Sequence, residues 1–230
     1  MGEISRWFLW TWIILISDVR SVMLPEITDG TFIDECVKEH NRARSSVNPP
    51  ASNMMPMSWD EDLAITAREW ATKCLFEHNP NRRRPNSNSV GENLWVGYPP
   101  SFFNVLGSIK SWDDEKQYYD FDSQACTKVC GHYTQVVWAS SNKVGCAAHL
   151  CPDGIKETDF GRKESVIFVC NYSPAGNMNR RKPYKSTGWT TADSGSSYVG
   201  ILVVRPIALI LTFVAAYAVR HFYPDVFCYE

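Results

Sequence analysis

The stretch CGHYTQVVWASSNKVGC, residues 130–146, places one histidine among apolar and hydroxyl side chains and has a cysteine at each end. Valine and aromatic residues bounded by turn residues are typical of β-strands. On this pattern we predict strands at residues 132–140, 143–151 and 165–172, paired as an antiparallel sheet. His132 is then either a core histidine or part of a functional site, and this stretch alone leaves both interpretations open.

Three helices are predicted before these strands. Residues 31–47 carry apolar side chains at helical spacing and stop at Asn-Pro-Pro, which does not continue a helix. Residues 59–76 begin with Asp60 as a natural N-cap, and residues 101–116 repeat apolar side chains at helical spacing. Helices followed by a cluster of strands favour an α+β fold, which we expect to be a three-layer α/β/α sandwich.

Both ends of the chain carry apolar segments. Residues 1–21 combine a short charged region, an apolar core and small or polar residues, and this order predicts a secretory signal peptide. Residues 199–219 would form a helix of about 31 Å, long enough to be a transmembrane helix. Arg205 lies in its second turn and can extend toward the membrane surface. The competing interpretation is a lipid-anchor signal whose small residues are 193–197.

These segments divide the chain into five parts. We expect a signal peptide at 1–21, one domain at 22–185, a linker at 186–198, the transmembrane helix at 199–219 and a short cytoplasmic tail at 220–230. The protein is then a single-pass membrane protein of the secretory pathway, with its domain outside the cell or in the lumen; a secreted form is compatible with the same pattern. The formal net charge of -2 gives no broad attraction to nucleic acid.

Cysteine usage agrees with the secretory route. In an oxidising compartment disulfides are the expected state. The chain has no Cys-x-x-Cys pair and its spacings match no zinc module, so a thiolate metal site is disfavoured. An odd number precedes the expected linker, so these cannot all pair within the domain. The eight cysteines are at positions 36, 74, 126, 130, 146, 151, 170 and 228.

Four titratable residues lie next to residues that look buried: His78, Glu92, Glu115 and His132. Burying a charge without a partner is costly, so two imidazoles and two carboxylates could satisfy one another. Each carboxylate would fix one histidine tautomer and leave the other ring nitrogen for a divalent metal. Spacing alone does not bring them together, because His78 and His132 are 54 residues apart, and four separately satisfied core residues are the alternative.

The carboxylates near the end of the third predicted helix differ in expected orientation. Glu115 follows Trp112 by three positions and is expected beside the apolar stripe, whereas Asp113 and Asp114 are expected to point away. The chain has no His-Glu-x-x-His, Gly-x-Ser-x-Gly or phosphate-binding glycine motif. No catalytic residue is therefore predicted, and an enzyme is not indicated by motif.

The opening stretch also identifies a family. GHYTQVVWASS followed by FVCNYSPAGN resembles the paired signatures of the CAP superfamily, which includes cysteine-rich secretory proteins, antigen 5 and pathogenesis-related proteins. The segments HNRARSSVNPPASNM, GENLW and the Trp-x-x-Glu that ends at Glu115 occur in the family order. LPEITDGTFIDECVKEHN and the HFYP at the end of the expected membrane span are similar to the glioma pathogenesis-related branch of that superfamily.

The resemblance implies an α/β/α sandwich with a cleft formed by His78, Glu92, Glu115 and His132. In the family, the two histidines can hold Zn²⁺ or another divalent cation. The resemblance also implies disulfides, with Cys126 and Cys130 expected to pair with each other and Cys36 and Cys228 left without an assigned partner. The pairs implied by the family are Cys74 with Cys151 and Cys146 with Cys170.

Three functional hypotheses follow. The first is a membrane-anchored extracellular binding module, whose cleft holds a divalent cation and whose ligand is a protein or a lipid. The second is a metal-assisted hydrolase in which Glu92 or Glu115 acts as general base toward a bound water. The third is a lipid-binding protein that uses the aromatic loop GYPPSFF, residues 97–103. Sterol binding is doubtful, because the loop that sterol-binding members use is short here, at residues 118–130.

Overall fold

The computed structural model describes residues 23–82, 89–179 and 181–187. Its central four-stranded sheet has the order β1-β5-β6-β2. The long strands β2, β5 and β6 pair antiparallel, whereas the short β1 is parallel to β5. The strands are β1 (Ser58–Trp59), β2 (Gly91–Gly97), β5 (Lys143–Cys151) and β6 (Ser165–Ser173).

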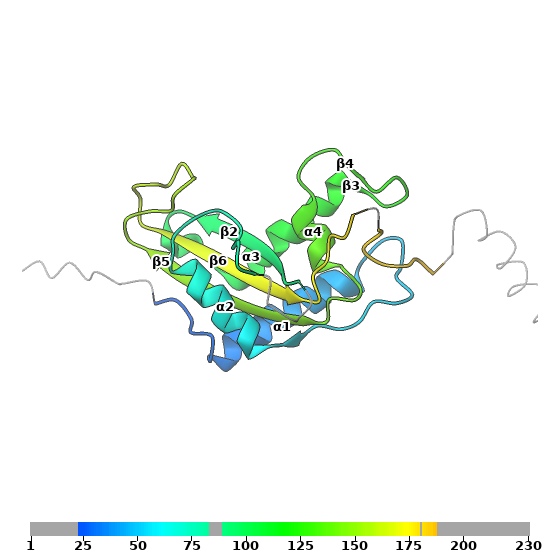
Figure 1. The fold of residues 1–230 in the computed structure, drawn as a ribbon, viewed down its shortest axis with the longest axis horizontal. Helices are drawn as coiled ribbons and strands as arrows, with labels where there is room; N and C mark the ends of the chain where they lie inside the picture. Colours follow the sequence, from blue (N-terminus) through cyan, green and yellow to red (C-terminus); the bar gives the residue numbers. More distant parts are fainter. Residues whose placement is uncertain (1–22, 83–88, 180, 188–230) are drawn as a thin grey trace, which may run out of the picture.

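Helices cover both faces of this sheet, and Figure 1 shows α2 lying across β5 and β6. The loop between β5 and β6 projects at one end of the molecule, and a small β3–β4 hairpin projects at the other. The helices are α1 (Gly30–Ser45), α2 (Glu61–Ala71), α3 (Val105–Asp113) and α4 (Gly131–Val136). The shorter elements are the 3-10 turns η1 (Pro100–Phe102) and η2 (Asp114–Tyr118), with β3 (Tyr119–Asp120) and β4 (Ala125–Cys126).

Alternation along β6 creates two cores. Phe168 and Tyr172 face α1, α3 and α4, while Ile167 and Val169 face α2. Side chains of a strand alternate between faces, so a strand covered on both sides must be apolar throughout. The two cores establish the predicted three-layer α+β sandwich.

The approach of α2 to the sheet is close. A Cβ at Gly145 would lie 2.2 Å from the backbone nitrogen of Ala64, so only glycine fits at this position of β5. The N-cap at Asp60 is present as predicted, because its side chain accepts a hydrogen bond from the backbone nitrogen of Leu63 at 3.0 Å. Together these contacts fix the start of α2 against β5.

Three expectations about local structure were wrong or incomplete. Residues 132–140 do not form a strand, because α4 covers the first part of this segment and a turn follows. The strand β2 was not predicted, since its sequence begins Gly-Glu-Asn, residue types that are rare in strands. Asp113 is buried rather than pointing away, and its carboxylate accepts a hydrogen bond from Lys116 at 2.9 Å.

The expected signal peptide, transmembrane helix and cytoplasmic tail lie outside the described residues. Within the part of the chain that is described, no helix has both the length and the apolar character that crossing a membrane requires. In the predicted lipid-contacting loop, Phe102 is exposed but Phe103 packs against Trp95 and Phe168. Of these two phenylalanines, only Phe102 is therefore presented to an external ligand.

The three disulfides of the described residues are those expected. Cys74–Cys151 joins the segment after α2 to the end of β5, and Cys146–Cys170 links directly opposed positions of β5 and β6. Cys126–Cys130 closes the loop between β4 and α4. Cys36 is a free, buried thiol of α1, and burial raises its pKa well above the usual value.

The buried His40 is expected to make the stability of the fold sensitive to acid. His40 is fully buried, and this burial, opposed in part by a hydrogen bond to Cys36, lowers its pKa from 6.5 to about 4. Between these values the unfolded chain binds a proton that the folded chain does not, so stability is full above pH 6.5 and falls toward pH 4. We expect about 3 kcal/mol of unfolding free energy to be lost over this interval.

Urea denaturation at several pH values measures this effect. A His40→Gln variant keeps a donor and an acceptor without titrating, so its stability should change less between pH 6.5 and pH 4. Parallel pH profiles for the two proteins would show that His40 is not responsible.

Candidate functional site

The first histidine–glutamate pair joins the segment after α2 to β2. The Nδ1 atom of His78 lies 2.8 Å from Oε1 of Glu92, which also accepts the backbone N–H of Asn79 at 2.9 Å. The Glu92 side chain is 0% exposed, whereas the His78 side chain is 52% exposed. A carboxylate only accepts hydrogen bonds, so Nδ1 of His78 carries the proton and Nε2 is left as a lone-pair donor.

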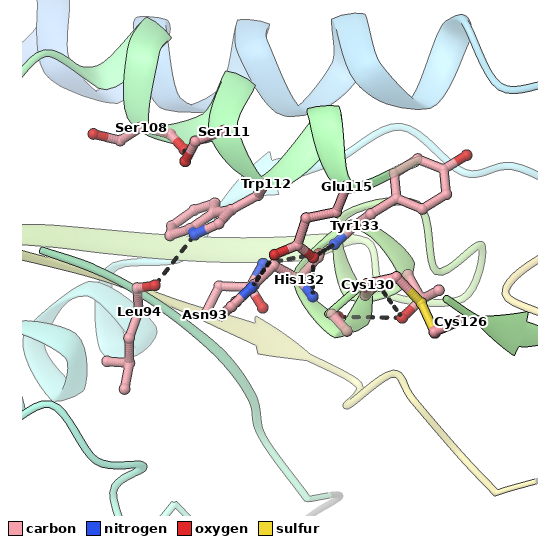
Figure 2. A network of polar contacts seen from close by, with 12 residues as sticks. Asn93, Leu94, Ser108, Ser111, Trp112, Glu115, Cys126, Cys130, His132 and Tyr133 are labelled. Carbon is pink, nitrogen blue, oxygen red and sulfur yellow. Dashed lines mark hydrogen bonds and ion pairs between the residues drawn. A yellow bond between two sulfur atoms is a disulfide. The ribbon is translucent and has the colours of Figure 1, made fainter. Parts of the chain in front are cut away.

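The second pair joins η2 to α4 (Figure 2). Oε1 of Glu115 lies 2.6 Å from Nδ1 of His132, and Oε2 accepts the backbone N–H groups of His132 and Tyr133 at 3.0 and 3.2 Å. The first N–H groups of a helix lack partners within the helix, so this carboxylate satisfies two of them for α4. Glu115 thereby fixes both the start of α4 and the ring of its second residue.

An aromatic ring also contacts the imidazole of His132. The indole of Trp112 stacks on the imidazole, with centroids 6.2 Å apart and planes 18° from parallel. The indole is itself anchored, because its N–H donates to the backbone oxygen of Leu94 at 3.2 Å. The His132 side chain remains 27% exposed, so the ring is held on one side and reachable from the other.

Two neighbouring elements connect the pairs. Asn93 follows Glu92 on β2, and its side-chain nitrogen donates to the backbone oxygen of His132 at 3.0 Å. Gln135, one turn after His132 on α4, lines a cavity of about 330 Å³ that also contains His78 and Glu92. The structure arranges the four predicted residues as two pairs, and of these four residues His78 and Glu92 line the cavity whereas Glu115 and His132 do not.

The wall of this cavity depends on glycine. A Cβ at Gly91 would lie 2.2 Å from Oε1 of Gln135, and this oxygen accepts the backbone N–H of Gly176 at 3.0 Å. Sequence reasoning did not select Asn93 or Gln135, although both amides are buried. The position of Asn93 beside Glu92 in the segment GEN was the available signal.

The donor chemistry fits a divalent cation bound by two imidazoles. A histidine that ligates a metal usually donates its other ring N–H to a carboxylate, which is the arrangement of both pairs. In the described ranges, no group of three or more His, Cys, Asp or Glu residues is placed to hold a metal. The imidazoles that Glu92 and Glu115 orient are those of His78 and His132, and these two rings would be the ligands of a cation that water or an external ligand also coordinates.

The described residues thus form an α/β/α sandwich that carries two carboxylate–histidine pairs. Residues 37–172 match the family model described as CAP, the cysteine-rich secretory protein family. The chain belongs to this family.

The relatives agree with the expected branch. GLIPR1-like protein 1 of Bos taurus is 45% identical over 183 residues, which are 77% of this chain and 73% of that protein. Glioma pathogenesis-related protein 1 of Mus musculus is 48% identical over 180 residues, or 77% of this chain and 65% of that protein.

A solved structure extends the comparison to the fold. The crystal structure of NaASP2 with Zn²⁺ has a TM-score of 0.52 and 26% identity, covering 71% of this chain and 87% of that one.

Proposed function

We propose that the protein is an extracellular, membrane-anchored binding module that holds a divalent cation through His78 and His132. The observation that supports this proposal is the geometry that the two pairs share. In each pair a glutamate oxygen accepts a hydrogen bond from Nδ1 of the histidine ring. When bound, the cation supplies a Lewis-acid point to which an oxygen of an external ligand coordinates. The related structure solved with Zn²⁺ makes zinc the cation to test first.

The residues of the site favour binding over hydrolysis. Glu92 is fully buried, so it is not presented to water. Both oxygens of Glu115 already accept hydrogen bonds from His132 or the start of α4. A general base must reach the proton that it removes; the buried Glu92 does not, and Glu115 already accepts three hydrogen bonds.

Neutralising either glutamate is expected to weaken zinc binding. In Glu92→Gln and Glu115→Gln the amide no longer stabilises a donating imidazole N–H as a carboxylate does, and loss of such outer contacts costs about 10- to 100-fold in affinity. Isothermal titration with Zn²⁺ measures the change. Glu164→Gln, a substitution of an exposed glutamate in the β5–β6 loop, is the matched control. Wild-type affinity in both site variants would contradict the proposed role of the carboxylates.

The membrane anchor is assigned to residues 199–219 from the sequence. Carbonate extraction of cells that express the full chain should leave the protein in the membrane pellet, because an apolar helix of this length is stable in the bilayer. A variant with Leu209→Asp and Leu211→Asp should move to the soluble fraction or the medium, because each carboxylate is costly to place in the bilayer. Extraction of the wild-type protein by carbonate would contradict a transmembrane anchor.

A further inference from the structure

A chain of buried hydrogen bonds runs from α1 through β6 and β2 to the backbone of His132. Nδ1 of His40 lies 2.7 Å from the backbone oxygen of Cys36, and Nε2 lies 2.9 Å from the hydroxyl of Tyr172. The side-chain nitrogen of Asn93 lies 3.2 Å from the same hydroxyl and 3.0 Å from the backbone oxygen of His132. His40, Tyr172 and Asn93 are all buried.

The donor and the acceptor of each hydrogen bond in this network follow from the chemistry of the groups. The backbone oxygen of Cys36 only accepts, so Nδ1 of His40 is the donor and Nε2 of the neutral ring is an acceptor. Burial keeps His40 neutral near pH 7, because it lowers its pKa to about 4. The hydroxyl of Tyr172 therefore donates to Nε2, and burial raises the pKa of this phenol so that it stays protonated. The Asn93 amide then donates one hydrogen to Tyr172 and the other to His132.

The hydrogen-bond network ends at His132, the residue that Glu115 also contacts. Glu115 fixes the backbone nitrogen and Nδ1 of His132, and Asn93 fixes its backbone oxygen. These contacts leave Nε2 as the ring atom that can ligate. The neighbouring residues Glu92 and Asn93 of β2 thus each hold one of the two histidines.

We propose that His40, Tyr172 and Asn93 are positioning residues that set the place of His132 as a ligand, an inference that rests on the proposed function. Three polar side chains in a core cost solvation free energy that apolar residues of similar size would not. All three are paired with one another in a single directional chain, and such networks specify one arrangement of the groups that they join. In this protein, the arrangement that the network specifies is the position of α4 and of His132.

Removing one hydroxyl tests the proposal in the full-length protein. Tyr172→Phe leaves Nε2 of His40 and one hydrogen of Asn93 without their partner, and zinc affinity by titration should fall about 10-fold. Tyr184→Phe is the matched control, because it also removes a buried hydroxyl, one bonded to Tyr133 and not to this chain. Its zinc affinity should stay within about 2-fold of wild type.

A second pair of variants decides the matter if Tyr172→Phe does not fold. His40→Gln can donate to Cys36 and accept from Tyr172, so it should keep zinc affinity, whereas His40→Leu should lose it as Tyr172→Phe does. Equal affinities in His40→Gln and His40→Leu, or in Tyr172→Phe and wild type, would overturn the positioning role.

A metal-free readout separates this inference from the proposed function. In ¹⁵N spectra of the histidine rings without metal, the His132 signals should shift in Tyr172→Phe and not in Tyr184→Phe. If wild-type protein binds no zinc but the ring signals shift in this way, the proposed function fails and the positioning chain stands. Unchanged His132 signals in Tyr172→Phe would overturn the chain itself.

Discussion

Replacing His78 and His132 together with alanine is expected to lower zinc affinity by more than about 100-fold, since changes to outer contacts alone already cost about 10- to 100-fold. Among the described residues, these two rings are the only imidazoles whose Nδ1 is hydrogen-bonded to a glutamate. Each single variant should also bind weakly, because one imidazole with water makes a poor zinc site. Titration with Zn²⁺, followed by metal analysis after dialysis, measures the loss.

The loss should not reflect unfolding. His78 is half exposed and His132 is partly exposed, so neither truncation opens a large cavity in the core. His149→Ala is the matched control, because His149 is a partly buried histidine of β5 that belongs to neither pair. If the double variant binds zinc as wild type does, the metal lies elsewhere and the proposed site is wrong.

The second large effect concerns Arg44, whose substitution by Met should lower the unfolding free energy by about 3–5 kcal/mol. Its buried guanidinium donates to the backbone oxygens of Val136, Trp138 and Ala139 at 2.9, 2.8 and 3.2 Å. It also donates to Met55, with Nε 2.9 Å from the backbone oxygen. Burial lowers its pKa to about 10, so the group is still charged at neutral pH.

The physical reason is the number of acceptors left behind. Without the guanidinium, four backbone oxygens lose their hydrogen-bond donor. Each buried acceptor without a partner costs about 1–3 kcal/mol of stability, and less where water reaches it. Three of the oxygens belong to the end of α4 and the turn after it, so α1 and the support of His132 loosen together.

Urea denaturation compares Arg44→Met with Arg42→Met. Arg42 is on the same helix, but it is half exposed and pairs with Glu39 at 2.6 Å, so its loss should cost less than the loss of Arg44. Equal stabilities for the two variants would contradict the structural role given to Arg44.

Periodicity and capping predicted much of the fold. The helices α1, α2 and α3 and the strands β5 and β6 follow from apolar spacing and from the N-cap at Asp60. The segment of α4 was assigned to a strand because its valines and aromatic residues favour strands locally. Its helix depends on Glu115, 17 positions away from His132, which accepts two N–H groups at its start. No local pattern contains that contact.

The site was predicted in part. Residue chemistry selected the two histidines and two glutamates, and the resemblance grouped them, but their assignment to two separate pairs is a structural result. Asn93 and Tyr172 were not selected, because an amide and a tyrosine within strands have ordinary interpretations. Their role depends on hydrogen bonds between residues 79 positions apart.

The most direct test of the proposed site is anomalous diffraction at the zinc edge from crystals of the zinc-loaded protein. We expect one zinc peak about 2.0–2.1 Å from Nε2 of both His78 and His132, with non-protein oxygen completing the coordination. A zinc peak that contacts only one of these histidines, or none at saturating zinc, would contradict it.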